Sequence, residues 1–183
     1  MTHIYIDTNV FLDFYQSATD RLKVFKDLHA RAERILVTEQ TVAEFRRNRV
    51  ALLVDLAANI KKTSNVQIFT TAVVRELPEF QEWKKSRDSA REIAERMAEE
   101  LMRWTLDSST DLVHSEFEEL IKSCQYIRTS EGAITRAHRR KLIGQPPTSP
   151  DKHTIGDELI WESLLEGAKG DLVVVSRDKT FLE

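Results

Sequence analysis

Four acidic residues fall where predicted secondary-structure elements begin or end. They are Asp7, Glu44, Asp157 and Asp178. Asp7 directly follows the predicted strand at 3–6, and Asp178 comes shortly after the predicted strand at 171–175. Ligands of open parallel sheets bind beyond the carboxyl ends of the strands. We therefore expect these two carboxylates to converge at one edge of a sheet.

The other two acids lie on predicted helices near the same edge. Glu44 is two turns into the helix predicted at 38–61, and Asp157 is in the first turn of the helix predicted at 154–167. Ionised carboxylates gathered in one cleft need a counter-charge, because each pair about 4 Å apart repels by roughly 4 kcal/mol at an effective dielectric constant near 20. A ligand set of oxygens alone, without His or Cys, favours Mg²⁺ or Mn²⁺ over Zn²⁺. Such a site activates water and stabilises charge on a phosphodiester oxygen.

Each acid also has an explanation that involves no metal. Asp7 or Thr8 could cap the helix that follows, and residues 41–44 match a capping box. Asp157 in a first helical turn complements the helix dipole, and Asp178 suits an ordinary turn. Spacing by itself leaves both interpretations open, although all four acids gather around one predicted edge.

Strand-like segments alternate with helical ones along the chain. The strand candidates are 3–6, 35–37, 66–69 and 171–175, and the predicted helices include 38–61, 87–106 and 154–167. Strands separated by helices pair in parallel, which predicts an α/β fold with helices packed on the sheet. The stretch 78–150 has almost no strand signal, so we expect a helical insertion within a single domain spanning 1–183.

Composition excludes several classes of protein. The net charge of −3 gives no overall attraction to nucleic acid, so a polyanion would have to meet a local basic patch or a bound cation. The single cysteine, Cys124, excludes an intrachain disulfide and a Cys-rich zinc site, and it suits a reducing cytosol. Without a signal peptide or an apolar run of about 20 residues, we expect a cytoplasmic protein that does not enter the membrane.

Two basic stretches are candidates for contacts with phosphate. They comprise Arg46 and Arg47, directly after Glu44, and Arg136, Arg139, Arg140 and Lys141. Contacts from such residues would bind RNA without reading its sequence. A solvated helix face would have the same composition, so this alternative stays open.

Four segments resemble the PIN domain family, and within it a bacterial branch of PIN-like ribonucleases. They are IYIDTNVFLD, TEQTVAEFRRNR, IGDELIWESLL and LVVVSRDKTF. The resemblance covers both ends of the chain but not residues 70–145. It implies an α/β/α sandwich around a parallel sheet in the order 3-2-1-4-5. The sequence ends five residues after Asp178, before the family's last helix and fifth strand. We therefore expect about four strands here, without the fifth edge strand, in either a minimal variant or a fragment of a longer protein.

The resemblance also implies an activity, an endoribonuclease that depends on Mg²⁺ or Mn²⁺ and leaves 5′-phosphate and 3′-hydroxyl ends. Asp7, Glu44, Asp157 and Asp178 match the family's acidic residues, which bind metal. Thr8, Asn9 and Ser176 match polar residues beside them, with Asn9 orienting a carboxylate or water. Such enzymes serve as toxins with a protein antitoxin, in defence, or in RNA processing, and they often form homodimers.

The sequence leaves two rival functions open. A PIN fold can be retained as an inactive module that binds RNA or protein, although the four intact acids argue against that. A phosphatase with an Asp nucleophile also uses an acid after its first strand. That class usually has Asp-x-Asp at this point, whereas this chain has Asp7-Thr8-Asn9.

Overall fold

The computed structural model describes residues 1–17, 22–67, 70–148 and 153–181. The chain divides into two compact units. One consists of Met1–Arg49 and Leu112–Glu183, and the other consists of Val50–Asp111. All four candidate acids belong to the first unit.

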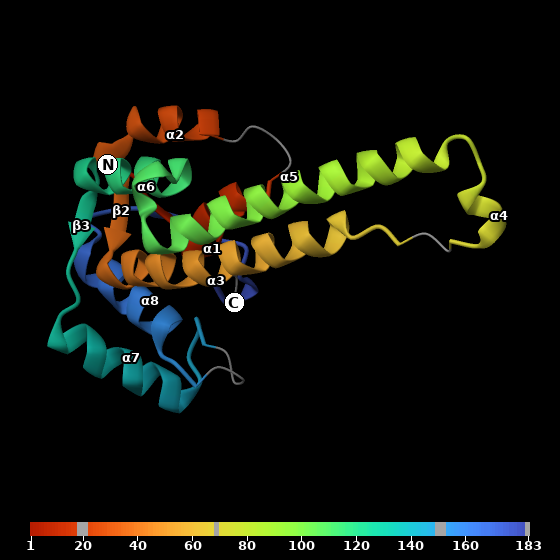
Figure 1. Cartoon of the computed structure of the whole chain (residues 1–183). Helices are drawn as coiled ribbons and strands as arrows, with labels where there is room; N and C mark the ends of the chain where they lie inside the picture. Colours follow the sequence, from red (N-terminus) through yellow and green to blue (C-terminus); the bar gives the residue numbers. More distant parts are fainter. Residues whose placement is uncertain (18–21, 68–69, 149–152, 182–183) are drawn as a thin grey trace. The chain divides into compact units, whose positions relative to one another are not determined.

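A parallel sheet organises the first unit (Figure 1). Among the described residues the sheet has four strands in the order β3-β2-β1-β4, and each neighbouring pair is parallel. The elements in chain order are β1 (His3–Ile6), α1 (Thr8–Leu12), η1 (Asp13–Tyr15), α2 (Leu22–His29), η2 (Ala32–Arg34), β2 (Ile35–Thr38), the start of α3 (Glu39–Ser64), α6 (Leu112–Ser123), β3 (Gln125–Ile127), α7 (Glu131–Ile143), α8 (Gly156–Gly167), β4 (Leu172–Val175) and η4 (Lys179–Phe181). The predicted α/β fold with a parallel sheet is confirmed.

The register between β1 and its neighbour β4 sets the position of the candidate site. β1 pairs with β4 from His3↔Leu172 to Ile6↔Val175, so both strands end at the same level. The Asp7 backbone N–H donates to Val175 O at 2.9 Å, which extends the pairing by one step. The residues that directly follow β1 and β4 are therefore neighbours at the carboxyl edge of the sheet.

The third strand differs from its prediction. Of the candidate strand at 66–69, Val66 and Gln67 are not in a strand, and 68–69 lie outside the described residues. The strand that pairs with β2 is instead β3, inside the stretch 78–150 that was expected to be a helical insertion. This strand has three residues and a largely exposed side-chain pattern. An edge strand of this kind is specified by its pairing partner, so it has little signal of its own.

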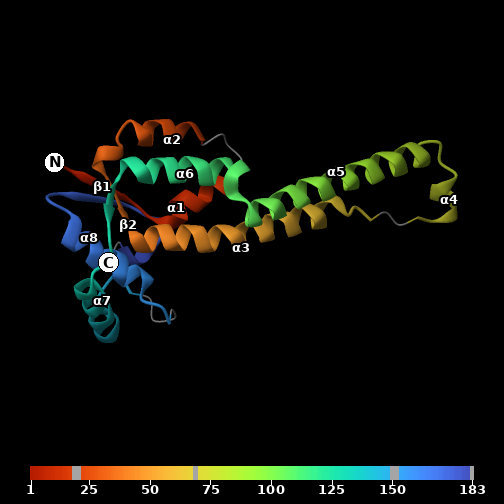
Figure 2. The same cartoon turned by 60° about the vertical axis from the view of Figure 1, so that its left-hand side comes forward.

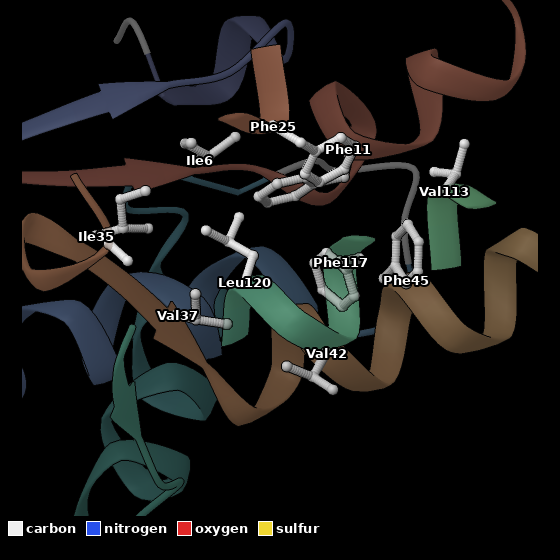
Figure 3. Close-up of a cluster of buried hydrophobic side chains, with 11 residues drawn as sticks. Ile6, Phe11, Phe25, Ile35, Val37, Val42, Phe45, Val113, Phe117 and Leu120 are labelled. Carbon is white, nitrogen blue, oxygen red and sulfur yellow. The ribbon is translucent and has the colours of Figure 1, made fainter. Parts of the chain in front are cut away.

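Side chains along each strand point alternately to the two faces of the sheet, so the hydrophobic core forms one layer on each face. On one face, Ile6, Ile35 and Val37 pack with aromatic residues of the helices α1, α2 and α6, as Figure 3 shows. On the other face, Tyr5 and Leu36 pack against Ile160 and Leu164 of α8. Because both faces are covered by helices, the central strands are apolar on both sides, as in other parallel sheets.

The second unit is helical in its described residues. It contains the later part of α3, α4 (Ala72–Arg75), α5 (Phe80–Leu106) and η3 (Ser108–Thr110). The later part of α3 runs beside α5, and α4 lies at the end where the two are connected (Figures 1 and 2). The helix predicted at 87–106 forms and begins earlier, at Phe80. Among the described helices, none is long and apolar enough to cross a bilayer.

Candidate active site

Asp7 is buried at the end of β1, with 6% of its surface exposed. Its Oδ1 accepts a hydrogen bond of 2.7 Å from the Thr8 N–H and so caps α1. Its Oδ2 accepts a 2.5 Å hydrogen bond from Ser176 Oγ. The capping role considered for Asp7 is therefore real, and it fixes the carboxylate at the sheet edge instead of excluding a function there.

Ser176 connects the first and last of the four acids. Its Oγ accepts from the Asp178 N–H at 2.9 Å while donating to Asp7. The Thr180 N–H donates to Asp178 Oδ1 at 3.0 Å. Arg177, between them, donates to Asp13 Oδ1 of η1 at 2.8 Å. These contacts tie the turn after β4 to the residues that follow β1.

Glu44 approaches the site from α3 and lies against the start of α8. Its Oε1 accepts from Gln40 Nε2, one turn earlier on α3, at 2.8 Å. A Cβ atom added at Gly156 would overlap Glu44 Oε1, so the glycine makes room for this carboxylate. Asp157 is the next residue along α8. The capping box suggested for residues 41–44 does not form, because α3 begins at Glu39 and Thr38 Oγ1 accepts from the Thr41 N–H.

The four acids influence one another electrostatically. Burial raises the pKa of Asp7 above its ordinary value, and the charges of Asp157 and Asp178 raise it further, against the hydrogen bonds from Ser176 and Thr8. Burial likewise raises the pKa of Glu44, and Asp157 and Asp7 add to this effect. The Gln40 hydrogen bond and the charge of Arg47 oppose the increase at Glu44. The structure thus brings together carboxylates that are far apart in the sequence.

The residues present suit a hard divalent cation by their chemistry. In the part of the chain that the structure describes, no three His, Cys, Asp or Glu side chains are close enough together to hold a metal ion as they stand. The charged forms of Asp7 and Glu44, which burial and the neighbouring carboxylates disfavour, would nevertheless gain from a nearby positive charge. In the described residues Asn9 Oδ1 and Thr8 Oγ1 are buried without a hydrogen-bond partner, beside Asp7. Oxygen atoms of this kind can bind Mg²⁺ or Mn²⁺ directly, or accept hydrogen bonds from water molecules bound to the ion.

The basic candidates lie on two helices, α3 and α7, and their surroundings differ. Arg46 makes a two-point contact with Glu118, with Nε–Oε1 and Nη2–Oε2 both 2.9 Å. Arg47 is exposed, and its charge acts on Glu44. On α7, Arg139 is exposed, whereas Arg136 and Arg140 bind Glu162 of α8 and Lys141 lies 3.4 Å from Glu158. Contacts of these residues with RNA stay a prediction, and Arg47 is best placed for one.

Several polar residues around the acids were not identified from the sequence. Tyr5 OH lies 3.0 Å from Thr41 Oγ1, which lies 2.8 Å from Thr38 Oγ1. Burial first, and the charge of Asp7 next, raise the pKa of Tyr5 well above its ordinary value, so the phenol keeps its proton. Two features of the sequence could have pointed to Tyr5 and Gln40. Tyr5 shares a strand face with Asp7, and Gln40 is four residues before Glu44 on one helix face.

Replacing Ser176 by Ala should weaken metal binding by about 10- to 100-fold, the usual effect of removing a group that orients a ligand. The hydroxyl holds both the Asp7 carboxylate and the Asp178 backbone. Calorimetric titration with Mn²⁺ measures the affinity. Ser123→Ala, an exposed position at the end of α6, serves as the control. An unchanged Mn²⁺ affinity in Ser176→Ala would show that Ser176 does not orient a ligand.

Replacing Gly156 by Ala should displace Glu44 while leaving the fold intact, because the atom in the way is the end of a flexible side chain. We expect Mn²⁺ affinity to fall about tenfold and the circular dichroism spectrum to stay the same. A double-mutant cycle gives the control. In a Glu44→Ala background, Gly156→Ala should have no further effect on affinity, and an equal loss in both backgrounds would contradict this explanation.

Comparison with known proteins identifies the family. The sequence matches the PIN domain family over residues 4–181. This match includes the middle of the chain, which the four resembling segments did not cover. Searches of curated proteins and of solved structures give no match. PIN domains are generally nucleases that use divalent metals. Since the match spans nearly the entire sequence, from β1 to η4, the chain belongs to the PIN domain family.

Proposed function

We propose that this protein is a metal-dependent endoribonuclease whose active site comprises Asp7, Glu44, Asp157 and Asp178. One observation carries the proposal. At the carboxyl edge of the sheet, the charges of Asp157 and Asp178 act on the ionisation of Asp7, and the charges of Asp157 and Asp7 act on that of Glu44. A protein with no use for a cation there would gain stability by replacing one of them.

The acids would hold one or two Mg²⁺ or Mn²⁺ ions. The bound cation supplies an activated water and stabilises charge on the phosphodiester. The chain itself fixes the acids, since Ser176 and the Thr8 N–H position Asp7 and Gln40 positions Glu44. Asn9, whose buried oxygen has no partner among the described residues, would orient a carboxylate or a water. Arg47 would contact a phosphate near Glu44.

The biological setting is a further part of the proposal. Cleavage by a metal-activated water would leave 5′-phosphate and 3′-hydroxyl ends. We propose a cytoplasmic role as a toxin controlled by a protein antitoxin, or a role in defence or RNA processing. The formation of a homodimer also stays a prediction.

The test is cleavage of end-labelled single-stranded RNA by the purified protein with Mg²⁺, with Mn²⁺ and with a chelator. We expect cleavage only when a metal is added, and the new ends should carry 5′-phosphate. RNA binding without cleavage under all conditions would instead favour the inactive binding module. Hydrolysis of a small phosphate ester with intact RNA would favour the phosphatase.

A further inference from the structure

A pocket of about 500 Å³ opens in the first unit. It is lined by Arg140, Gln145, the prolines 146 and 147, Trp161, Thr180 and Phe181. None of the four acids lines it, and its walls come from α7, α8, η4 and the segment after α7. The function proposed above assigns it no role.

The pocket adjoins the candidate active site through two of its walls. Trp161 is four residues after Asp157 on α8, so the two side chains share one face of that helix. Thr180 belongs to η4, and its backbone N–H donates to Asp178 Oδ1 at 3.0 Å. A molecule in the pocket would therefore lie next to two of the acids proposed to hold the metal.

The chemistry of the walls favours a flat aromatic ligand over a phosphate. Trp161 and Phe181 are half-buried, with ring centroids 6.2 Å apart and planes inclined by 56°. The Arg140 guanidinium is held by Glu162 through Nε at 2.8 Å and Nη2 at 2.6 Å, and Nη1 donates to Pro146 O. Each of its three nitrogens thus already donates a hydrogen bond, and Glu162, which Arg136 also contacts, offsets part of its charge. An anion therefore finds few available donors on this guanidinium, whereas a ring finds aromatic and planar surfaces on which to stack.

Gln145 adds an amide group that can form hydrogen bonds with the edge of such a ring. Its side chain is exposed at the pocket, and an amide both donates and accepts hydrogen bonds. Aromatic stacking surfaces combined with an amide are the features with which proteins hold unstacked bases of single-stranded RNA.

We propose that this pocket binds a nucleobase of the RNA, adjacent to the phosphodiester that is cleaved. The inference rests on the proposed ribonuclease function and deepens it, because it identifies a subsite for one unstacked base of the substrate. Bases of a duplex are stacked on their neighbours and cannot enter a side pocket.

A binding experiment tests the pocket without requiring catalysis. The chain has three tryptophans, so the double variant Trp83→Phe and Trp104→Phe leaves Trp161 as the sole indole. Titration with adenosine 5′-monophosphate should quench its fluorescence to saturation, whereas ribose 5-phosphate, which lacks the base, should not. Equal quenching by both compounds, or by neither, would overturn the proposal.

A kinetic experiment places the base relative to the cleaved bond. Removing single bases from a short RNA, without altering its backbone, should raise KM about tenfold at one position beside the cleavage site. Trp161→Ala should raise KM to a similar extent on the intact RNA and have little effect on the RNA that lacks this base. Trp161→Phe, which keeps an aromatic ring, should restore most of the affinity, and Trp104→Phe should behave as the wild type.

The two proposals fail in different ways. If the protein cleaves RNA with a metal, but neither base removal nor substitution of Trp161 changes KM, the base-binding role of the pocket is refuted and the ribonuclease function is retained. Base-dependent quenching without cleavage under any metal would overturn the ribonuclease and support the pocket as a nucleotide site.

Discussion

Asp7→Asn should lower the rate of RNA cleavage by about a thousandfold or more, which corresponds to about 4 kcal/mol of lost transition-state stabilisation. Asp7 is the most buried of the four acids, and its carboxylate is fixed from two sides by the Thr8 N–H and Ser176 Oγ. An amide has nearly the same shape but no negative charge to share with a cation. The measurement is single-turnover cleavage of labelled RNA at saturating Mn²⁺.

The fold should survive this substitution. The Asn oxygen can still accept from the Thr8 N–H, and its amide can donate to Ser176 Oγ. Asp27→Asn, which makes the same change at an exposed position on α2, provides the control for loss of a carboxylate and should keep full activity. Substantial cleavage by a folded Asp7→Asn protein would remove Asp7 from the metal site and refute the proposed mechanism.

Mn²⁺ should stabilise the wild-type protein at neutral pH by several degrees. A ligand at 100 times its Kd contributes about 2.7 kcal/mol, and about 1 kcal/mol shifts the Tm of a chain of this size by roughly 2–4 °C. Burial, and after it the charges of neighbouring carboxylates, raises the pKa values of Asp7 and Glu44, and a bound cation would offset both effects. Thermal unfolding followed by circular dichroism, with and without Mn²⁺, measures the shift.

The pH dependence follows from the direction of the pKa shifts. Folding raises the pKa of Asp7 above 3.8, so the folded state binds this proton more tightly than the unfolded state does. In the metal-free protein, Asp7 therefore destabilises the fold above its raised pKa, and this penalty disappears as the pH falls through that value toward 3.8. Stabilisation by Mn²⁺ should disappear over the same range, because protons compete for the carboxylate.

Comparing the unfolding of the wild type with that of Asp7→Asn isolates the effect of this one carboxyl group. Other carboxyl groups have lowered pKa values, and their effect on stability has the opposite pH dependence. Without metal, Asp7→Asn should be more stable than the wild type at neutral pH and equally stable near pH 3.8, the ordinary pKa of Asp. Mn²⁺ should have little effect on the Tm of the variant. A constant difference between the two proteins at all pH values would contradict a raised pKa at Asp7.

The local sequence determined β1 and β4 and the residues that end them. β1 and β4 are short runs of β-branched, aromatic and aliphatic residues that stop at polar residues, and the predicted strands at 3–6 and 171–175 agree with them closely. The same residues carried the resemblance to the PIN domain, and with it the four candidate acids. These features depend on a few consecutive residues, so propensity and pattern were sufficient to predict them.

Only the tertiary structure decided which groups meet. Ser176 reaches Asp7 because β1 and β4 pair in one particular register, and Glu44 meets the start of α8 because Gly156 leaves space for it. The sequence also did not predict that Glu158 and Glu162 of α8 partly compensate the positive charge of α7. Nor did it predict β3, a strand that forms because it pairs with β2. Contacts between residues far apart in the chain depend on register, packing and the absence of a side chain at one position, and a local pattern records none of these.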